Sequence, residues 1–179
     1  MSKAVLVIAI LFFMIFCQAQ AMVMVTNPKK ETNSLTAEML LERGSRAFED
    51  SDTEEAIKLF RKSIRADKSS YEAYYRLGVA YANIREFKKA ISCFKKALKF
   101  KRDFAKAYVN LGSAYGSLKI YKQALAAFRK ALALEPDDPV IYYNIGSIYT
   151  AMKKQDLALK YFDKAKKLGL DSAGQKKRE

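Results

Sequence analysis

Apolar residues recur along much of the chain at spacings of three and four, which place side chains on one face of an α-helix. Two such faces follow each other between residues 74 and 98, and polar residues occupy the positions between them. The pattern predicts two amphipathic helices joined by a short turn. The apolar positions are Tyr74, Leu77, Gly78 and Tyr81 on the first helix, and Ala90, Ile91, Phe94, Ala97 and Leu98 on the second.

The same pair of faces occurs four times, at a constant offset of 34 residues and without an insertion. The units span residues 37–70, 71–104, 105–138 and 139–172. One helical hairpin cannot bury its apolar face alone, so we expect the four hairpins to stack into a solenoid with a shared core. The markers of the repeat are Gly44, Gly78, Gly112 and Gly146, then Ala56, Ala90, Ala124 and Ala158, and then Phe60, Phe94, Phe128 and Phe162.

Small residues and helix-start signals support this division. Glycine and alanine stand where the paired helices would approach most closely, and a larger side chain there would push the two backbones apart. Three segments carry the residues that commonly begin a helix, including one with proline at its first position. The signals are Ser51 with Glu54, Ser69 with Glu72, and Asp138 followed by Pro139.

The second unit, with Tyr74-x-x-Leu77-Gly78-x-x-Tyr81 and Ala90-x-x-x-Phe94, resembles the tetratricopeptide-repeat signature, with tyrosine in place of its tryptophan. The first unit departs from the signature, as terminal repeats often do. The resemblance implies an all-α, right-handed superhelical solenoid of four helix-turn-helix repeats. The third and fourth units match at Tyr108, Leu111, Gly112, Tyr115, Ala124, Phe128 and Pro136, and at Tyr142, Ile145, Gly146, Tyr149, Ala158 and Phe162; the first has Leu40, Arg43 and Ala47 instead.

The resemblance also implies a function. In this family the first helix of each repeat lines a concave groove that holds an extended peptide or a helix of a partner protein. We therefore expect a protein-interaction scaffold without a cofactor. The groove residues expected by unit position are Tyr75, Arg76, Val79 and Asn83, then Lys106, Val109, Asn110, Ser113 and Ser117, and then Tyr143, Asn144, Ser147 and Thr150.

Two asparagines occupy the same position of successive units, Asn110 and Asn144. Side-chain amides can donate to and accept from an extended peptide backbone, and some relatives use a ladder of asparagines in this way. Here the ladder has two rungs, because Glu42 and Arg76 occupy the other corresponding positions. The alternative is that asparagine is simply common at this position of the repeat.

A second recognition pattern of the family, the clamp for a terminal carboxylate, is only partly present. Lys106 and Asn110 fit it, whereas Leu41, Ser45 and Arg76 do not. We therefore favour a ligand other than the peptides that chaperone-binding relatives hold.

The N-terminus resembles an export signal. Lys3 precedes an apolar run from Ala4 to Phe16, and small residues end the segment at Ala19 and Ala21. We expect a signal peptide over residues 1–21, a polar linker over residues 22–36 and a secreted or periplasmic protein. The apolar stretch is also just long enough for an uncleaved membrane anchor, and lipidation at Cys17 is the least favoured alternative. Residues 173–179 form a basic polar tail.

The net charge of +14 favours anionic partners. Residues 85–102 hold eight basic side chains and one acidic side chain, and Lys88, Lys95 and Lys99 form a basic stripe opposite the apolar face of their helix. The stripe is either a solvated outer surface or a contact for anionic lipid or an acidic partner. Nucleic acid is disfavoured, because no recognised reading motif accompanies the charge.

The sequence offers little for catalysis. It contains no histidine, and its two cysteines are Cys17 in the signal segment and Cys93 among core positions. No zinc-ligand spacing, phosphate-binding glycine loop or catalytic dyad occurs, so we expect no catalytic and no metal site. The alternative to a groove-binding scaffold is a membrane-associated assembly factor that docks through its basic outer face and N-terminal segment.

The last unit has no obvious capping helix after residue 169. We expect its second helix to remain partly uncovered, at Leu157, Leu159 and Tyr161. This end either meets a partner or a second copy of the chain, or is an exposed edge of a monomer.

Overall fold

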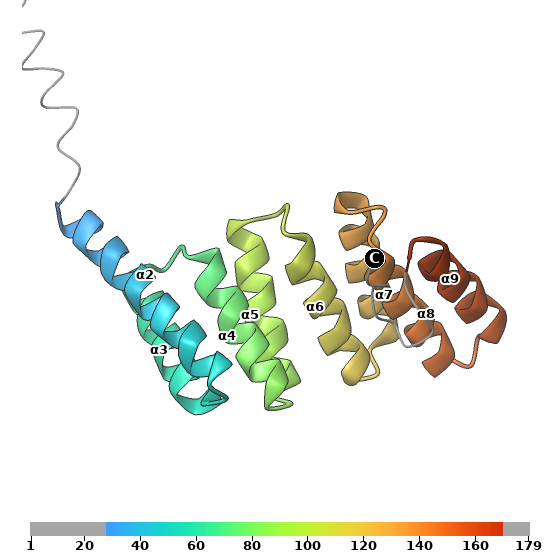
Figure 1. Cartoon of the computed structure of the whole chain (residues 1–179), viewed down its shortest axis with the longest axis horizontal. Helices are drawn as coiled ribbons and strands as arrows, with labels where there is room; N and C mark the ends of the chain where they lie inside the picture. The colour runs from blue at the N-terminus through green and yellow to red at the C-terminus, as the bar shows by residue number, and fades with distance from the viewer. Residues whose placement is uncertain (1–27, 170–179) are drawn as a thin grey trace, which may run out of the picture.

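The computed structural model describes residues 28–169, and within them the chain forms helices and turns but no strand. The predicted all-α solenoid is confirmed. Consecutive helices pair into four hairpins that follow one another along the long axis of the molecule (Figure 1). The helices are α2 (Pro28–Glu49), α3 (Thr53–Ala66), α4 (Tyr71–Asn83), α5 (Phe87–Phe100), α6 (Ala105–Ser117), α7 (Tyr121–Leu134), α8 (Pro139–Ala151) and α9 (Gln155–Lys167).

The hairpins form two layers. The backbone of the first helix of each hairpin approaches that of the first helix of the next, whereas the backbones of successive second helices lie farther apart. We call α2, α4, α6 and α8 the inner layer, and α3, α5, α7 and α9 the outer layer. Because the inner helices are more closely spaced, the stack curves toward them.

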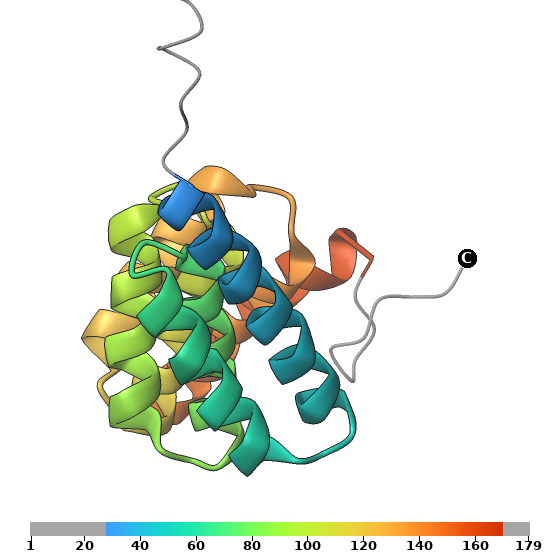
Figure 2. The same cartoon turned by 90° about the vertical axis from the view of Figure 1, so that its left-hand side faces the viewer.

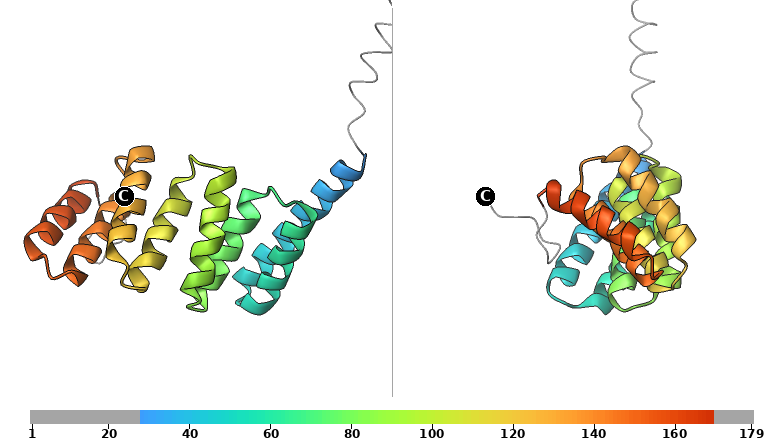
Figure 3. Two further views of the ribbon diagram at one scale, coloured as in Figure 1. Left: turned by 180° about the vertical axis from the view of Figure 1, so that it is seen from behind. Right: turned by 90° about the vertical axis from the view of Figure 1, so that its right-hand side faces the viewer.

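The stack contains only neighbouring contacts. Each hairpin touches the hairpins before and after it, and the described helices of non-adjacent hairpins do not meet. The junction between α7 and α8 is less extensive than those between α3 and α4 or between α5 and α6. Views along the axis show α2 and α3 at one end of the row (Figure 2) and α8 and α9 at the other (Figure 3).

The glycine of each hairpin lies at a close approach of the paired helices, as expected from the sequence, and it contacts the phenylalanine of the same unit. A Cβ added at Gly78 would lie 2.6 Å from Cε1 of Phe94, and one at Gly112 would lie 2.7 Å from Cε1 of Phe128. The phenylalanine ring occupies the space that a larger residue in the first helix would need. The same arrangement in the first hairpin, at Gly44 and Phe60, shows that the degenerate unit has kept the packing.

Side chains from adjacent hairpins merge into shared cores. One buried cluster joins α5 to α6 through Phe94, Leu98 and Leu111, and another joins α7 to α8 through Phe128 and Ile145. Burial of apolar surface between hairpins therefore holds the stack together.

Two predicted helix starts are one residue off, and the third is confirmed. Asp138 caps α8 by accepting from Val140 N, with Pro139 at the first position. Asp52 rather than Ser51 caps α3, because Ser51 adopts a left-handed backbone (φ 67°) that closes the preceding turn.

At α4 the predicted cap, Ser69, instead donates its hydroxyl to the Asp67 carboxylate at 2.6 Å. Ser70 takes over, accepting from Ala73 N at 3.2 Å. The sequence therefore predicts the cap of α4 one residue too early, because the Asp67 carboxylate holds the hydroxyl of Ser69.

The predicted linker over residues 22–36 is wrong for its second half. Helix α2 begins at Pro28, nine residues before the expected start at Ala37. Proline suits the first turn of a helix, where its missing N–H costs no hydrogen bond. The segments 1–21, 22–27 and 173–179 lie outside the described residues. No helix within residues 28–169 is long and apolar enough to cross a bilayer.

Candidate functional site

The inner layer carries every groove residue expected from the sequence. They lie on α4, α6 and α8, the first helices of the second to fourth hairpins. Tyr75, Arg76 and Asn83 come from α4; Lys106, Asn110 and Ser113 from α6; and Tyr143, Asn144 and Ser147 from α8.

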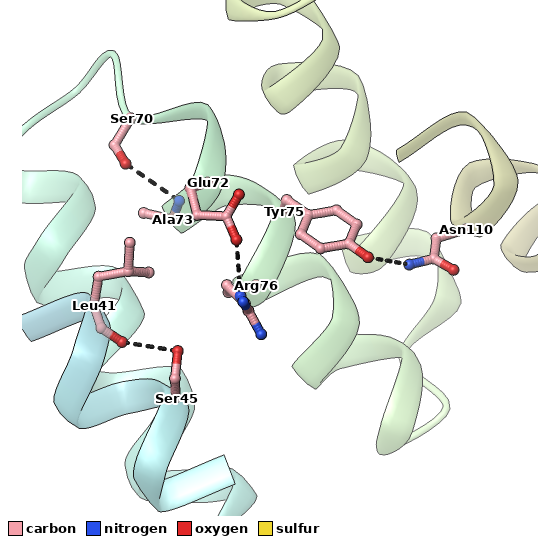
Figure 4. A network of polar contacts seen from close by, with 8 residues as sticks. All are labelled: Leu41, Ser45, Ser70, Glu72, Ala73, Tyr75, Arg76 and Asn110. Atoms are coloured by element: carbon pink, nitrogen blue, oxygen red, sulfur yellow. Dashed lines mark hydrogen bonds and ion pairs between the residues drawn. The ribbon is translucent and has the colours of Figure 1, made fainter. Parts of the chain in front are cut away.

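A hydrogen bond joins the inner helices of two neighbouring hairpins, α4 and α6. Asn110 donates its amide Nδ2 to the Tyr75 hydroxyl at 3.1 Å (Figure 4). The Tyr75 ring packs against Phe104 and Phe94, with centroid distances of 4.8 and 6.0 Å. One rung of the asparagine pair therefore shares its amide with the protein, and its carbonyl oxygen and second N–H remain for a ligand.

The Tyr75 hydroxyl remains protonated at neutral pH. Burial raises its pKa above the ordinary value, and the nearby Glu72 carboxylate acts in the same direction. Arg76 and the hydrogen bond from Asn110 partly oppose the change. Because this hydroxyl accepts from Asn110, its own proton is free to be donated into the groove.

Asn144 differs from Asn110 in its neighbour. The residue that corresponds to Tyr75 in the third hairpin is Val109, which has no hydroxyl. Within residues 36–169, whose side chains are described, the half-buried Asn144 amide makes no hydrogen bond. Beside it, the Tyr143 ring packs on Phe162 at a centroid distance of 5.3 Å. Asn144 is thus the freer of the two amides.

The groove hydroxyls are bonded to their own helices. Ser113 donates to the Val109 carbonyl at 3.1 Å, and Ser147 donates to the Tyr143 carbonyl at 3.0 Å. Both side chains are exposed, so they form small, polar surface positions that a partner can approach closely.

Two of the predicted groove residues are occupied by other contacts. Arg76 forms an ion pair with Glu72 on its own helix, with Nε and Oε1 2.9 Å apart. Asn83 donates its amide to the Thr53 hydroxyl at 3.2 Å, at the start of α3. Both side chains are therefore engaged by other residues of the protein.

Four of the five positions of a carboxylate clamp, Leu41, Ser45, Arg76 and Asn110, are drawn in Figure 4. Ser45 donates its hydroxyl to the Leu41 carbonyl at 3.1 Å, and the Leu41 side chain offers no polar group. Arg76 is held by Glu72, so the clamp lacks three of its five positions in geometry as well as in sequence.

The outer layer carries the charge. Helix α5 contains five lysines and α7 contains two lysines and one arginine, and neither helix contains an acidic residue. Lys88, Lys95 and Lys99, the predicted basic stripe, are all exposed. In the inner layer, α8 has no charged residue and α4 has one of each sign. The sequence predicted the stripe but missed this separation of charge between the layers.

The sequence interpretation also missed a set of lysine–tyrosine pairs that join outer helices to inner helices. Lys96 lies over the Tyr74 ring with Nζ 5.5 Å from the centroid, and Lys130 lies over Tyr108 at 5.7 Å. The fourth hairpin repeats the pair with Lys164 over Tyr142, also at 5.7 Å. The sequence contains the evidence for these pairs, since both the lysine and the tyrosine recur with the 34-residue period. The repeat signature, however, predicts only a core position for each tyrosine.

Cys93 is not a reactive centre. It is 8% exposed and lies in the core cluster with Phe60 and Leu77. Burial raises the pKa of its thiol to about 11, so the nucleophilic thiolate is scarce at neutral pH. No group of three metal-ligating side chains is assembled in the described part of the chain.

Models of the tetratricopeptide repeat match residues 71–104, 105–138 and 139–168. No curated protein sequence matches the chain. Among solved structures, a crystal structure of MamA is 30% identical with a TM-score of 0.71, over 84% of this chain and 85% of that one. A second MamA structure is 32% identical with a TM-score of 0.71, over 77% of this chain and 74% of that one.

A further similar structure is the first tetratricopeptide domain of Spaghetti (RPAP3), bound to the HSP90 peptide SRMEEVD. It is 27% identical with a TM-score of 0.66, over 67% of this chain and 95% of that one. Proteins of this family are generally non-enzymatic scaffolds for protein–protein interaction. Together, the matched repeats, the stacked hairpins and the glycine–phenylalanine contacts show that the chain belongs to the tetratricopeptide-repeat family.

Proposed function

We propose that this protein is a non-catalytic scaffold that holds a peptide segment or helix of a partner protein against its inner layer, within an exported or envelope complex. The observation that carries the proposal is the half-buried Asn144 amide, which has no hydrogen-bond partner among the described side chains and lies next to the Tyr143 ring. Its amide atoms are open to solvent, so the backbone of a ligand can take the place of water there and form hydrogen bonds with both sides of the amide.

An extended peptide suits this surface. Its backbone offers a donor and an acceptor at each residue, which an asparagine amide can match on both sides. The Asn110 carbonyl oxygen and the Tyr75 hydroxyl provide further contacts one hairpin away. The aromatic rings of Tyr75 and Tyr143 are available to pack against apolar side chains of the ligand.

The incomplete clamp bears on the kind of peptide. Relatives that hold a terminal carboxylate need a set of positive and amide side chains that is broken here at Leu41, Ser45 and Arg76. We therefore propose that the ligand is an internal segment rather than an acidic C-terminus.

A photoreactive residue at Ser147 should capture the partner from a lysate of the source cells. Ser147 is exposed and lies one helical turn after Asn144, and its hydroxyl bonds only its own helix. Replacing Asn144 with alanine should reduce capture about three- to tenfold, because one hydrogen bond to the ligand is lost. The measurement is the yield of the crosslinked band.

The control places the same photoreactive residue at Ser92, an exposed position of α5 in the outer layer. The groove is contradicted if the Ser92 variant captures the same protein, or if Asn110→Ala and Asn144→Ala together leave capture at Ser147 unchanged. The peptide SRMEEVD should not compete at concentrations that saturate the chaperone-binding relative.

The proposal that the protein is exported is based on its N-terminal segment. Sequencing the N-terminus of the mature protein tests this proposal. A start at Met22 supports cleavage of a signal peptide after Ala21 and removes a membrane anchor. A retained Met1 supports the alternative, a membrane-associated assembly factor. In that alternative the lysines of the outer layer would contact anionic headgroups, which attract them.

A further inference from the structure

The positive charge of the protein is concentrated in one layer. The outer helices α3, α5, α7 and α9 contain four, five, three and four basic residues, and only α3 and α9 contain acidic ones, two each. The inner helices α4, α6 and α8 together contain one acidic and two basic residues. The outer layer therefore presents a strongly positive field on the side away from the groove.

Hollows with aromatic floors lie between the inner and outer helices of the third and fourth hairpins. In the third hairpin a hollow of about 230 Å³ is lined by Tyr108, Tyr115, Ala126 and Lys130, and Lys95 of α5 lies over the Tyr115 ring at 5.7 Å. It is thus bordered by lysines from two neighbouring outer helices.

The fourth hairpin has a larger hollow, of about 470 Å³, at the corresponding place. Its lining includes Tyr142 and Tyr161, three lysines and one acidic residue. The charged members are Lys160, Lys164, Lys167 and Asp163. The two hollows repeat with the 34-residue period, since Tyr108 and Lys130 correspond to Tyr142 and Lys164.

The lysines at these hollows are held in place but not neutralised. The ammonium Nζ of Lys130 and that of Lys164 each lie 5.7 Å from the centroid of a tyrosine ring, and both side chains are exposed to solvent. The ion pairs between described residues are Arg46–Glu42, Lys58–Glu55, Arg76–Glu72 and Lys89–Glu86, so none involves a lysine of either hollow. Cations without an ion-pair partner beside apolar pockets are suited to carboxylates that flank an apolar side chain.

We propose that the outer layer is a second binding surface, which holds an acidic polypeptide segment whose aromatic or large aliphatic side chains enter the tyrosine hollows while its carboxylates pair with Lys95, Lys130 and Lys164. This surface is separate from the groove. The protein would then join two partners, a peptide segment or helix on the inner layer and an acidic segment on the outer layer.

The hollows favour a polypeptide over a membrane. A bilayer surface is flat and meets the outer, convex side of a curved stack along a narrow line, whereas a flexible segment follows the curvature. Side chains fill separate pockets, and anionic headgroups need only the field of the lysines.

The test measures binding of a fluorescent synthetic peptide in which glutamate alternates with phenylalanine, by anisotropy with the full-length chain. A peptide with serine in place of phenylalanine should bind about tenfold more weakly, because it leaves the hollows empty. The double variant Lys130→Glu and Lys164→Glu should also weaken binding of the phenylalanine peptide about tenfold.

Two further variants separate the hollows from the general field. Lys122→Glu and Lys166→Glu make the same change in net charge on the same two helices but do not line a hollow, and should weaken binding less than about threefold. Ala126→Trp fills the third-hairpin hollow without a change in charge, and should weaken binding about as much as the serine peptide does. Asn144→Ala should leave binding unchanged, so failure of the groove proposal does not decide this one.

Other outcomes overturn the proposal. Equal losses in the two double-lysine variants together with normal binding by Ala126→Trp would show a non-specific field. No binding of either peptide by the unmodified chain would remove the surface. Vesicles of phosphatidylserine and phosphatidylcholine that bind in a Lys130- and Lys164-dependent way, while the phenylalanine peptide does not, would assign the surface to a membrane.

Discussion

Replacing Phe94 with alanine is expected to lower the free energy of unfolding by about 3–5 kcal/mol. The Phe94 ring is fully buried and lies in the cluster shared by the second and third hairpins. Its removal leaves a cavity between two hairpins whose backbones are fixed by their other contacts. Chemical denaturation followed by circular dichroism at 222 nm measures the loss.

Phe100→Ala is the matched control, because Phe100 lies on the same helix and is 46% exposed. Its ring stacks on Tyr74 at a centroid distance of 5.9 Å, and its loss should cost only about 1 kcal/mol. If the two substitutions lowered the free energy of unfolding equally, Phe94 would not be a main contributor to the core between the hairpins.

Gly112→Ala is expected to destabilise the protein by about 1–3 kcal/mol, although alanine is the better helix former by about 1 kcal/mol. A Cβ at Gly112 would lie 2.7 to 2.8 Å from three carbons of the Phe128 ring. The ring is buried and cannot withdraw, so α6 and α7 must separate. Thermal unfolding of the variant reports the change.

Gly116→Ala on the same helix is the control. Its added Cβ would meet one atom within 4 Å, the flexible Cδ1 tip of Ile148 at 2.7 Å, which can rotate away. The propensity gain should therefore leave this variant neutral or slightly more stable. Combining Gly112→Ala with Phe128→Leu should recover part of the loss, and no recovery would mean that the ring is not the cause.

The fold was predictable because the same pattern of apolar and small residues occurs in four successive units. Glycine and phenylalanine recur with an uninterrupted 34-residue period, so an argument about close helix packing that holds for one hairpin applies to all four. Helix ends were less predictable, because they depend on single side chains. Ser51 and Ser69 are acceptable caps by residue type, and only the left-handed turn and the Asp67 carboxylate decide against them.

The helices that carry the candidate groove residues were predictable, but the contacts of those residues were not. The unit positions place Asn110 and Asn144 on the inner layer correctly. Their difference depends on a bond across 35 residues of sequence, from Asn110 to Tyr75, and on the lack of a hydroxyl at Val109. Such contacts depend on the register in which one hairpin stacks on the next, which the pattern within a single unit does not contain.

The short junction between α7 and α8 has a consequence for how a ligand would act on the protein. Because hairpins communicate only with their neighbours, the fourth hairpin is fastened to the rest mainly through this junction. A segment that touched both Asn110 and Asn144 would bridge it from the open side and act as a splint. Binding of the ligand would then stabilise the last hairpin, and a change that loosened this hairpin would weaken ligand binding.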